Sequence, residues 1–140
     1  MKLTIARLFS FTAGLFCLAA GLYVLWRPIQ TSSLLSYSFQ SLIGLSEFLV
    51  FYGGFSIGMG FYFITGAIVR RYLEGSLFFL AVSSLAAALT RLAIIIGNEV
   101  EASFYFFLAG ETTFFILGCA GVIICRNHYF VAKAKRNQLK

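Results

Sequence analysis

Three ionisable side chains, Glu47, Arg91 and Glu111, lie within or at the edge of long apolar runs. A charge at the centre of a bilayer costs about 2.5–3.5 kcal/mol on insertion scales. Such side chains therefore face neighbouring helices, a partner or a water-filled pocket, and they mark candidate functional sites. An arginine in this setting can bind an anionic group, and a carboxylate can transfer a proton.

The composition indicates that the elements carrying these charges are membrane helices. The 140 residues are 60% hydrophobic and 11% charged, whereas a soluble domain carries roughly 25% charged residues. A helix needs about 20 apolar residues to span the hydrocarbon, and four runs qualify, at about 8–26, 48–69, 76–97 and 104–125. The sequence predicts an all-α fold, a four-helix bundle forming one transmembrane domain over residues 1–140, with a basic tail at 126–140.

Lysine and arginine are distributed unevenly between the two ends of these helices. They occur before the first helix, between the second and third, and after the fourth, whereas the opposite loops contain only Arg27. By the positive-inside rule, both termini are predicted to be cytoplasmic. We expect the first helix to be retained, because its apolar run exceeds the ~7–15 residues of a secretory signal. The net charge of +6 is explained by topology, so we expect the lipid bilayer as a partner and no nucleic acid.

The three charges are predicted to lie at a similar depth in the outer half of the membrane. With a rise of 1.5 Å per residue, Arg91 lies roughly 9 Å and Glu111 roughly 10 Å below the outer ends of their helices. Glu47 begins the second helix from the same side. Each charge shares a helical face with small residues, which let membrane helices approach closely: Gly54 and Gly58 for Glu47, Ser84 for Arg91, and Gly118 for Glu111. The pattern predicts that the charges point into the bundle.

Two interpretations of this charge cluster remain open. In the first, Arg91 is held between the two carboxylates as a structural staple, although buried ion pairs add little net stability. In the second, the charges line a polar pocket that opens outward. Two glutamates against one arginine leave an excess of one negative charge, so either one glutamate is protonated or a cationic partner is missing.

The other polar residues give weaker signals. Tyr52, Gly54, Gly58 and Ser84 are candidates for lining the pocket. The three cysteines lie in apolar runs and have neither disulfide-like nor zinc-like spacing. The sequence contains no nucleophile–base arrangement, nucleotide-binding loop or haem ligand pair, and we predict no metal or cofactor.

The stretch from Glu47 to Gly60, EFLVFYGGFSIGMG, contains a Glu-x4-Tyr-Gly-Gly motif. Together with Arg91 and Glu111 in the next two predicted helices, it resembles a bacterial domain-of-unknown-function family of small four-helix membrane proteins. The resemblance covers roughly residues 44–126. It implies the four-helix fold and a location in the bacterial inner membrane, and it carries over no activity.

From these observations the sequence favours a small membrane protein that binds a lipid-like or amphipathic molecule in an outward-facing pocket lined by Glu47, Arg91 and Glu111. A membrane enzyme that uses one carboxylate as general acid or base is the first alternative. The second is an accessory subunit, docked to a membrane-protein partner or to a further copy of itself, in which the three charges are a staple.

Overall fold

The chain was analysed as a computed structural model that describes residues 2–138, with side chains described for 3–129. The described residues are helical and contain no strand, which confirms the predicted all-α class. The elements in order are α1 (Lys2–Trp26), α2 (Pro28–Leu34), α3 (Leu42–Phe48), the π-helix η1 (Leu49–Phe55), α4 (Ser56–Ile68), α5 (Arg70–Gly97) and α6 (Ala102–Gln138).

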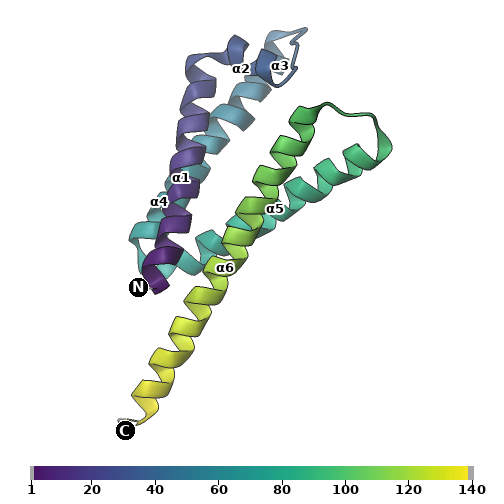
Figure 1. Ribbon diagram of the computed structural model, residues 1–140. Helices are drawn as coiled ribbons and strands as arrows, with labels where there is room; N and C mark the ends of the chain where they lie inside the picture. Colours follow the sequence, from purple (N-terminus) through teal and green to yellow (C-terminus); the bar gives the residue numbers. More distant parts are fainter. Residues whose placement is uncertain (1, 139–140) are drawn as a thin grey trace.

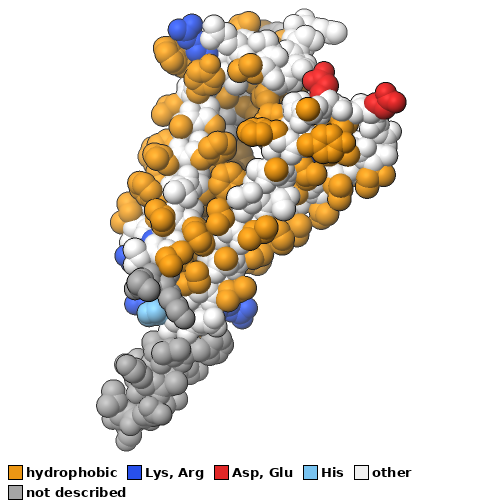
Figure 2. All heavy atoms as spheres, in the orientation of Figure 1, with side chains coloured by type: hydrophobic (Ala, Val, Ile, Leu, Met, Phe, Trp, Pro, Cys, Tyr) orange, Lys and Arg blue, Asp and Glu red, His pale blue; other side chains and the backbone are white. Residues whose placement is uncertain are grey.

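Four helical stretches are long and apolar enough to cross a membrane: Leu3–Trp26, Leu42–Ile68, Arg70–Gly97 and Ala102–Tyr129. The second is continuous from α3 through η1 to α4. Hydrophobic side chains cover the visible face of the molecule along most of the length of the helices (Figure 2). This exposure of apolar side chains suits a molecule surrounded by lipid, because such large exposed apolar surfaces are rare in soluble monomers.

The helices extend beyond the predicted spans: α1 and the α3–η1–α4 stretch begin six residues early, at Lys2 and Leu42. Helix α5 begins at Arg70, six residues before the predicted start, because only Val69 adopts an extended conformation between α4 and α5. Helix α6 continues through Gln138, so its backbone covers most of the predicted tail. Residues 139–140 of that tail lie outside the described residues.

The long helices form two antiparallel hairpins, one made of α1 with α3–η1–α4 and the other of α5 with α6 (Figure 1). The hairpins meet near the chain termini and diverge toward the ends that carry α2, α3 and the α5–α6 loop (Figure 1). We call these the closed end and the open end. Helix α1 packs against α4 within its own hairpin, and it also contacts both helices of the other hairpin, α5 and α6.

Two pairs of glycines bring α1 into close contact with α4 and with η1. Gly14 faces Gly60, and Gly21 faces Gly53. A Cβ atom on Gly60 would lie 2.8 Å from the backbone nitrogen of Leu18 and 2.9 Å from the carbonyl oxygen of Gly14. Small residues repeated at such spacings allow the backbones of membrane helices to touch.

A buried serine pair joins the two hairpins at the closed end. Ser10 on α1 and Ser76 on α5 are both fully buried. The Ser10 hydroxyl donates to the carbonyl oxygen of Phe63 on α4 at 2.7 Å, and its oxygen lies 3.0 Å from that of Ser76. Because buried hydroxyls need partners, these bonds fix the register of three helices. An apolar cluster that contains Ala13, Phe63 and Leu80 packs beside them.

The glycine contacts predict different effects for two nearby substitutions. Gly60→Ala should reduce the free energy of unfolding by about 1–3 kcal/mol, because the added methyl group overpacks the α1–α4 contact. Gly58→Ala is the matched control: a Cβ there meets no atom within 4 Å, so it should be neutral or slightly stabilising through helix propensity. Reversible denaturant unfolding in mixed micelles measures both, and equal effects would contradict this packing.

Candidate functional site

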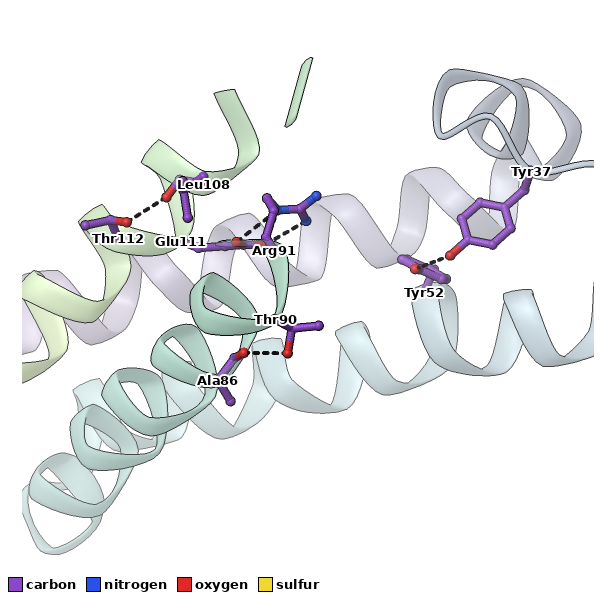
Figure 3. A network of polar contacts seen from close by, with 8 residues as sticks. All are labelled: Tyr37, Tyr52, Ala86, Thr90, Arg91, Leu108, Glu111 and Thr112. Atoms are coloured by element: carbon purple, nitrogen blue, oxygen red, sulfur yellow. Dashed lines mark hydrogen bonds and ion pairs between the residues drawn. The ribbon is translucent and has the colours of Figure 1, made fainter. Parts of the chain in front are cut away.

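Arg91 on α5 and Glu111 on α6 form a bidentate ion pair in the open half of the molecule (Figure 3). The Arg91 Nε group donates to Glu111 Oε1 and Oε2 at 3.1 and 3.0 Å, and Nη2 donates to Oε1 at 2.7 Å. The two side chains are 26% and 20% exposed. The pair is therefore held within the helices but remains accessible.

Close packing between α5 and α6 brings the pair together. Gly118 is buried against the backbone of Ala81, where a Cβ atom would lie 2.7 Å from the amide nitrogen, and Gly121 packs against the side chain of Leu77. The two helices are joined by the short loop at residues 98–101. Arg91 and Glu111 lie at similar distances from that loop, so antiparallel pairing places them opposite each other.

Two aromatic rings flank the guanidinium group of Arg91. Its Cζ atom lies 5.1 Å from the ring centroid of Phe107 and 5.8 Å from that of Phe104. Both rings come from the first turns of α6, one and two helical turns before Glu111. Aromatic faces attract cations within about 6 Å, so both rings favour the charged guanidinium group at this position.

Only part of the hydrogen-bonding capacity of Arg91 is used. A guanidinium group carries five N–H donors in a planar fork. Glu111 occupies the edge formed by Nε and Nη2. Among the described side chains no acceptor meets the other three N–H groups, two of which form the edge between Nη1 and Nη2. This second edge has the geometry that binds a carboxylate or phosphate group with two parallel bonds.

Two tyrosines provide polar groups on the opposite hairpin (Figure 3). The hydroxyl oxygens of Tyr37 and Tyr52 are 2.8 Å apart and share a hydrogen bond. One hydroxyl donates in this bond, so the other retains an unused O–H donor. In Figure 3 this tyrosine pair and the Arg91–Glu111 pair lie on different hairpins, and no hydrogen bond joins them. The open end therefore has polar groups on both hairpins.

An unusual turn directs Tyr37 to this position. Helix α2 ends with Ser36 at φ 58°, the left-handed conformation that glycine normally supplies. The Tyr37 and Ser36 amides donate to the carbonyl oxygens of Ser32 and Ser33 at 2.8 and 3.0 Å. The Tyr37 ring then packs at 5.4 Å from the buried ring of Phe48, which stacks on Tyr52 at 4.8 Å.

The structure distributes the other predicted site residues differently. Glu47 is exposed on α3 and takes no part in the pair, which is the one ion pair among the described side chains. The expected excess of negative charge is therefore absent from the site. Ser84 is half-buried on α5. Gly54 and Gly58 line an apolar groove of about 660 Å³ between η1–α4 and Phe79 of α5.

No metal site accompanies the pair. Among residues 3–129, no group of three His, Cys, Asp or Glu side chains is placed to hold a metal ion. Sequence reasoning did not find Tyr37, Phe104 or Phe107. The two phenylalanines could have been found, because they lie on the same helical face as Glu111 at separations of four and seven residues. Tyr37 lies in an irregular connection, where no periodicity reports the direction of a side chain.

The fold and the ion pair define the class: an all-helical protein with four apolar helices of membrane-spanning length and a paired arginine and glutamate inside the long helices. The chain belongs to the family described as domain of unknown function (DUF4345), whose model matches residues 5–121. This match includes α1, whereas the resemblance seen in the sequence covered only roughly residues 44–126. No curated protein and no solved structure shows significant similarity to the chain.

The pair predicts non-additive effects on stability. Arg91→Gln should lower the free energy of unfolding by about 1–3 kcal/mol, because Glu111 then keeps its charge without its partner. The double variant Arg91→Gln with Glu111→Gln should recover part of this loss, since two neutral amides can bond to each other. Denaturant unfolding of the four-member cycle measures the coupling, with Glu99→Gln in the exposed loop as control. Strict additivity would contradict a direct interaction.

Proposed function

We propose that this protein is an integral protein of a bacterial inner membrane that binds an amphipathic, lipid-like molecule at its open end, with both termini in the cytoplasm. The distribution of Lys and Arg supports this orientation, because these residues concentrate on the loops and ends beside the termini. The open end then lies in the outer leaflet, and the space between the hairpins is reached from the lipid.

The observation that carries the proposal is the unused edge of Arg91. Three N–H donors stand unmatched at a residue whose side chain is only 26% exposed. Unpaired polar groups in such a place are costly, so a ligand or ordered water must satisfy them. With Glu111 balancing the charge and a tyrosine O–H nearby, the site offers donors and little unbalanced charge. It suits an acceptor-rich headgroup such as a carboxylate, an ester or a phosphate.

The apolar groove provides the second half of the binding site. It begins at Val50, close to Tyr52 on the same π-helix, and continues past Gly54 and Gly58 to Phe79. No atom lies within 4 Å of a Cβ built on either glycine. An acyl or isoprenoid chain can therefore lie on the bare backbone of η1 and α4, while the headgroup remains near Arg91.

The geometry favours binding over the enzyme that the sequence left open. Both oxygens of Glu111 accept hydrogen bonds from Arg91, so most of the acceptor capacity of this carboxylate is already used and little is left for a substrate proton. Glu47 is exposed and has no neighbouring group that would position it for catalysis. A bound headgroup, in contrast, uses the N–H groups that the pair leaves over.

The test is mass spectrometry of small molecules and lipids that co-purify with the mildly extracted protein. Wild type should retain a specific amphipathic species, and folded Arg91→Gln should lose it at least tenfold, the effect of about 1.4 kcal/mol. Gly54→Leu should also weaken retention, because its side chain fills the groove while the ion pair remains. Glu47→Gln should bind like wild type.

Several outcomes would contradict the proposal. If Arg91→Gln retains the same species at the same ratio as wild type, the free edge of Arg91 does not bind it. If wild type retains nothing beyond bulk lipid, the pair is a structural staple of an accessory subunit, and a stoichiometric membrane-protein partner should co-purify instead. If Glu47→Gln loses the ligand and Arg91→Gln does not, the site is elsewhere on α3.

A further inference from the structure

A second polar cluster lies at the closed end, at the opposite ends of the same helices. The Nη2 group of Arg70, the first residue of α5, donates to Nδ1 of His128 on α6 at 3.2 Å. A guanidinium group can only donate, so Nδ1 of His128 must accept and the proton of the neutral ring is on Nε2. Among the side chains of residues 3–129, no acceptor meets the imidazole N–H or the other four N–H groups of Arg70.

Arg7 adds a third basic group to this end. It follows Ala6, which packs in one apolar cluster with Leu73 of α5, and Cys125 of α6 packs against the same cluster. Arg70 and His128 are each three residues from a member of that cluster, so α1, α5 and α6 present all three basic groups at one end. The Nε atom of Arg7 is buried and has no hydrogen-bond partner.

No ion pair neutralises these basic groups in the described part of the chain. The one ion pair there is Arg91 with Glu111, at the other end. Arg71 and Arg126 raise the local positive charge further, and Glu74 is the one acidic residue in the sequence near this end. Figure 2 shows basic side chains and the histidine gathered beside the termini, with the acidic side chains of this face at the open end.

The position of the cluster identifies the partner. Arg70 is the first residue of α5, and His128 follows Arg126, where the long apolar run of α6 gives way to polar residues. Exposed apolar side chains flank them toward the middle of the helices: Ile68 is 67% exposed, Tyr72 48% and Ile123 58%. Groups at this height meet lipid headgroups, and the adjoining apolar side chains meet acyl chains.

We propose that the closed end binds the phosphate of an anionic phospholipid between Arg7, Arg70 and His128. The phosphate oxygens accept from Arg70 and from Nε2 of His128, and the charge of the half-buried Arg7 side chain adds to the attraction. Bound there, the lipid bridges the start of α5 and the part of α6 around His128, beside Val69, which alone connects α4 to α5. This site is separate from the ligand at the open end and shares only the membrane setting with it.

Native mass spectrometry in a mild detergent tests the site, with equimolar phosphatidylglycerol and phosphatidylcholine added to the delipidated protein. Wild type should retain phosphatidylglycerol preferentially. Arg70→Gln and Arg7→Gln should each lower that retention about fivefold, the effect of losing one cation near a headgroup. Arg70→Lys should recover part of it. Arg27→Gln removes the same charge at the open end and should bind like wild type.

The remaining outcomes overturn the inference. If the wild-type protein retains the two lipids equally, it has no site specific for the anionic lipid, and this outcome is decided without any variant. An equal loss in Arg27→Gln would mean that total charge, and not this cluster, attracts the lipid. Displacement of phosphatidylglycerol by millimolar inorganic phosphate would make a soluble phosphate compound the ligand. Because Arg91→Gln should leave this binding unchanged, failure here is distinguishable from failure of the site at the open end.

Discussion

Within apolar helices, a polar side chain needs a partner from the protein or from a bound ligand, because hydrocarbon offers none. Ser10, Ser76, Arg91 and Glu111 meet this requirement across helix boundaries. Each bond forms only if its helices have one relative register, so the polar contacts select the arrangement. The threonines obey the same constraint within their own helices, as when Thr90 donates to the carbonyl oxygen of Ala86 at 2.9 Å. The cross-helix bonds therefore specify the fold, and the glycine contacts allow the backbones to come close enough to make them.

The two ends of the molecule differ because side-chain size changes along the helices. At the closed end, Ser10 and Gly66 are small enough for α1, α4 and α5 to meet around them. Toward the open end, the ring centroids of Phe16 and Phe114 lie 5.5 Å apart. Glu111 lies one turn nearer to the open end on α6. Beyond that contact the hairpins separate (Figure 1). The ion pair thus lies where close packing ends, so it is held by α5 and α6 while its unused edge faces the other hairpin.

The depth of Arg91 and Glu111 could be predicted because the helical rise is constant along α5 and α6. The same reasoning failed to predict which residues of the second membrane-length stretch face the other helices. The π-helix η1, from Leu49 to Phe55, closes i→i+5 bonds and turns less per residue than an α-helix. A face counted at α-helical spacing from Glu47 is therefore displaced once it passes η1. Gly53 and Gly60, which were not singled out, make the close contact with α1, whereas Gly54 and Gly58 face open space. No sequence signal marked η1, since its residues resemble any apolar helix.

The ion pair also shows why arginine is suited to this position. A lysine would neutralise Glu111 equally well, but its ammonium group is a compact point charge and would be largely used by the two carboxylate oxygens. The guanidinium group is planar and presents two edges, of which Glu111 occupies one. Phe104 and Phe107 lie beside it, and aromatic faces attract the cation without accepting the remaining N–H groups as a carboxylate would. In the proposed site the second edge is held rigid by the first, and a donor fork fixed before the ligand arrives loses little conformational entropy on binding.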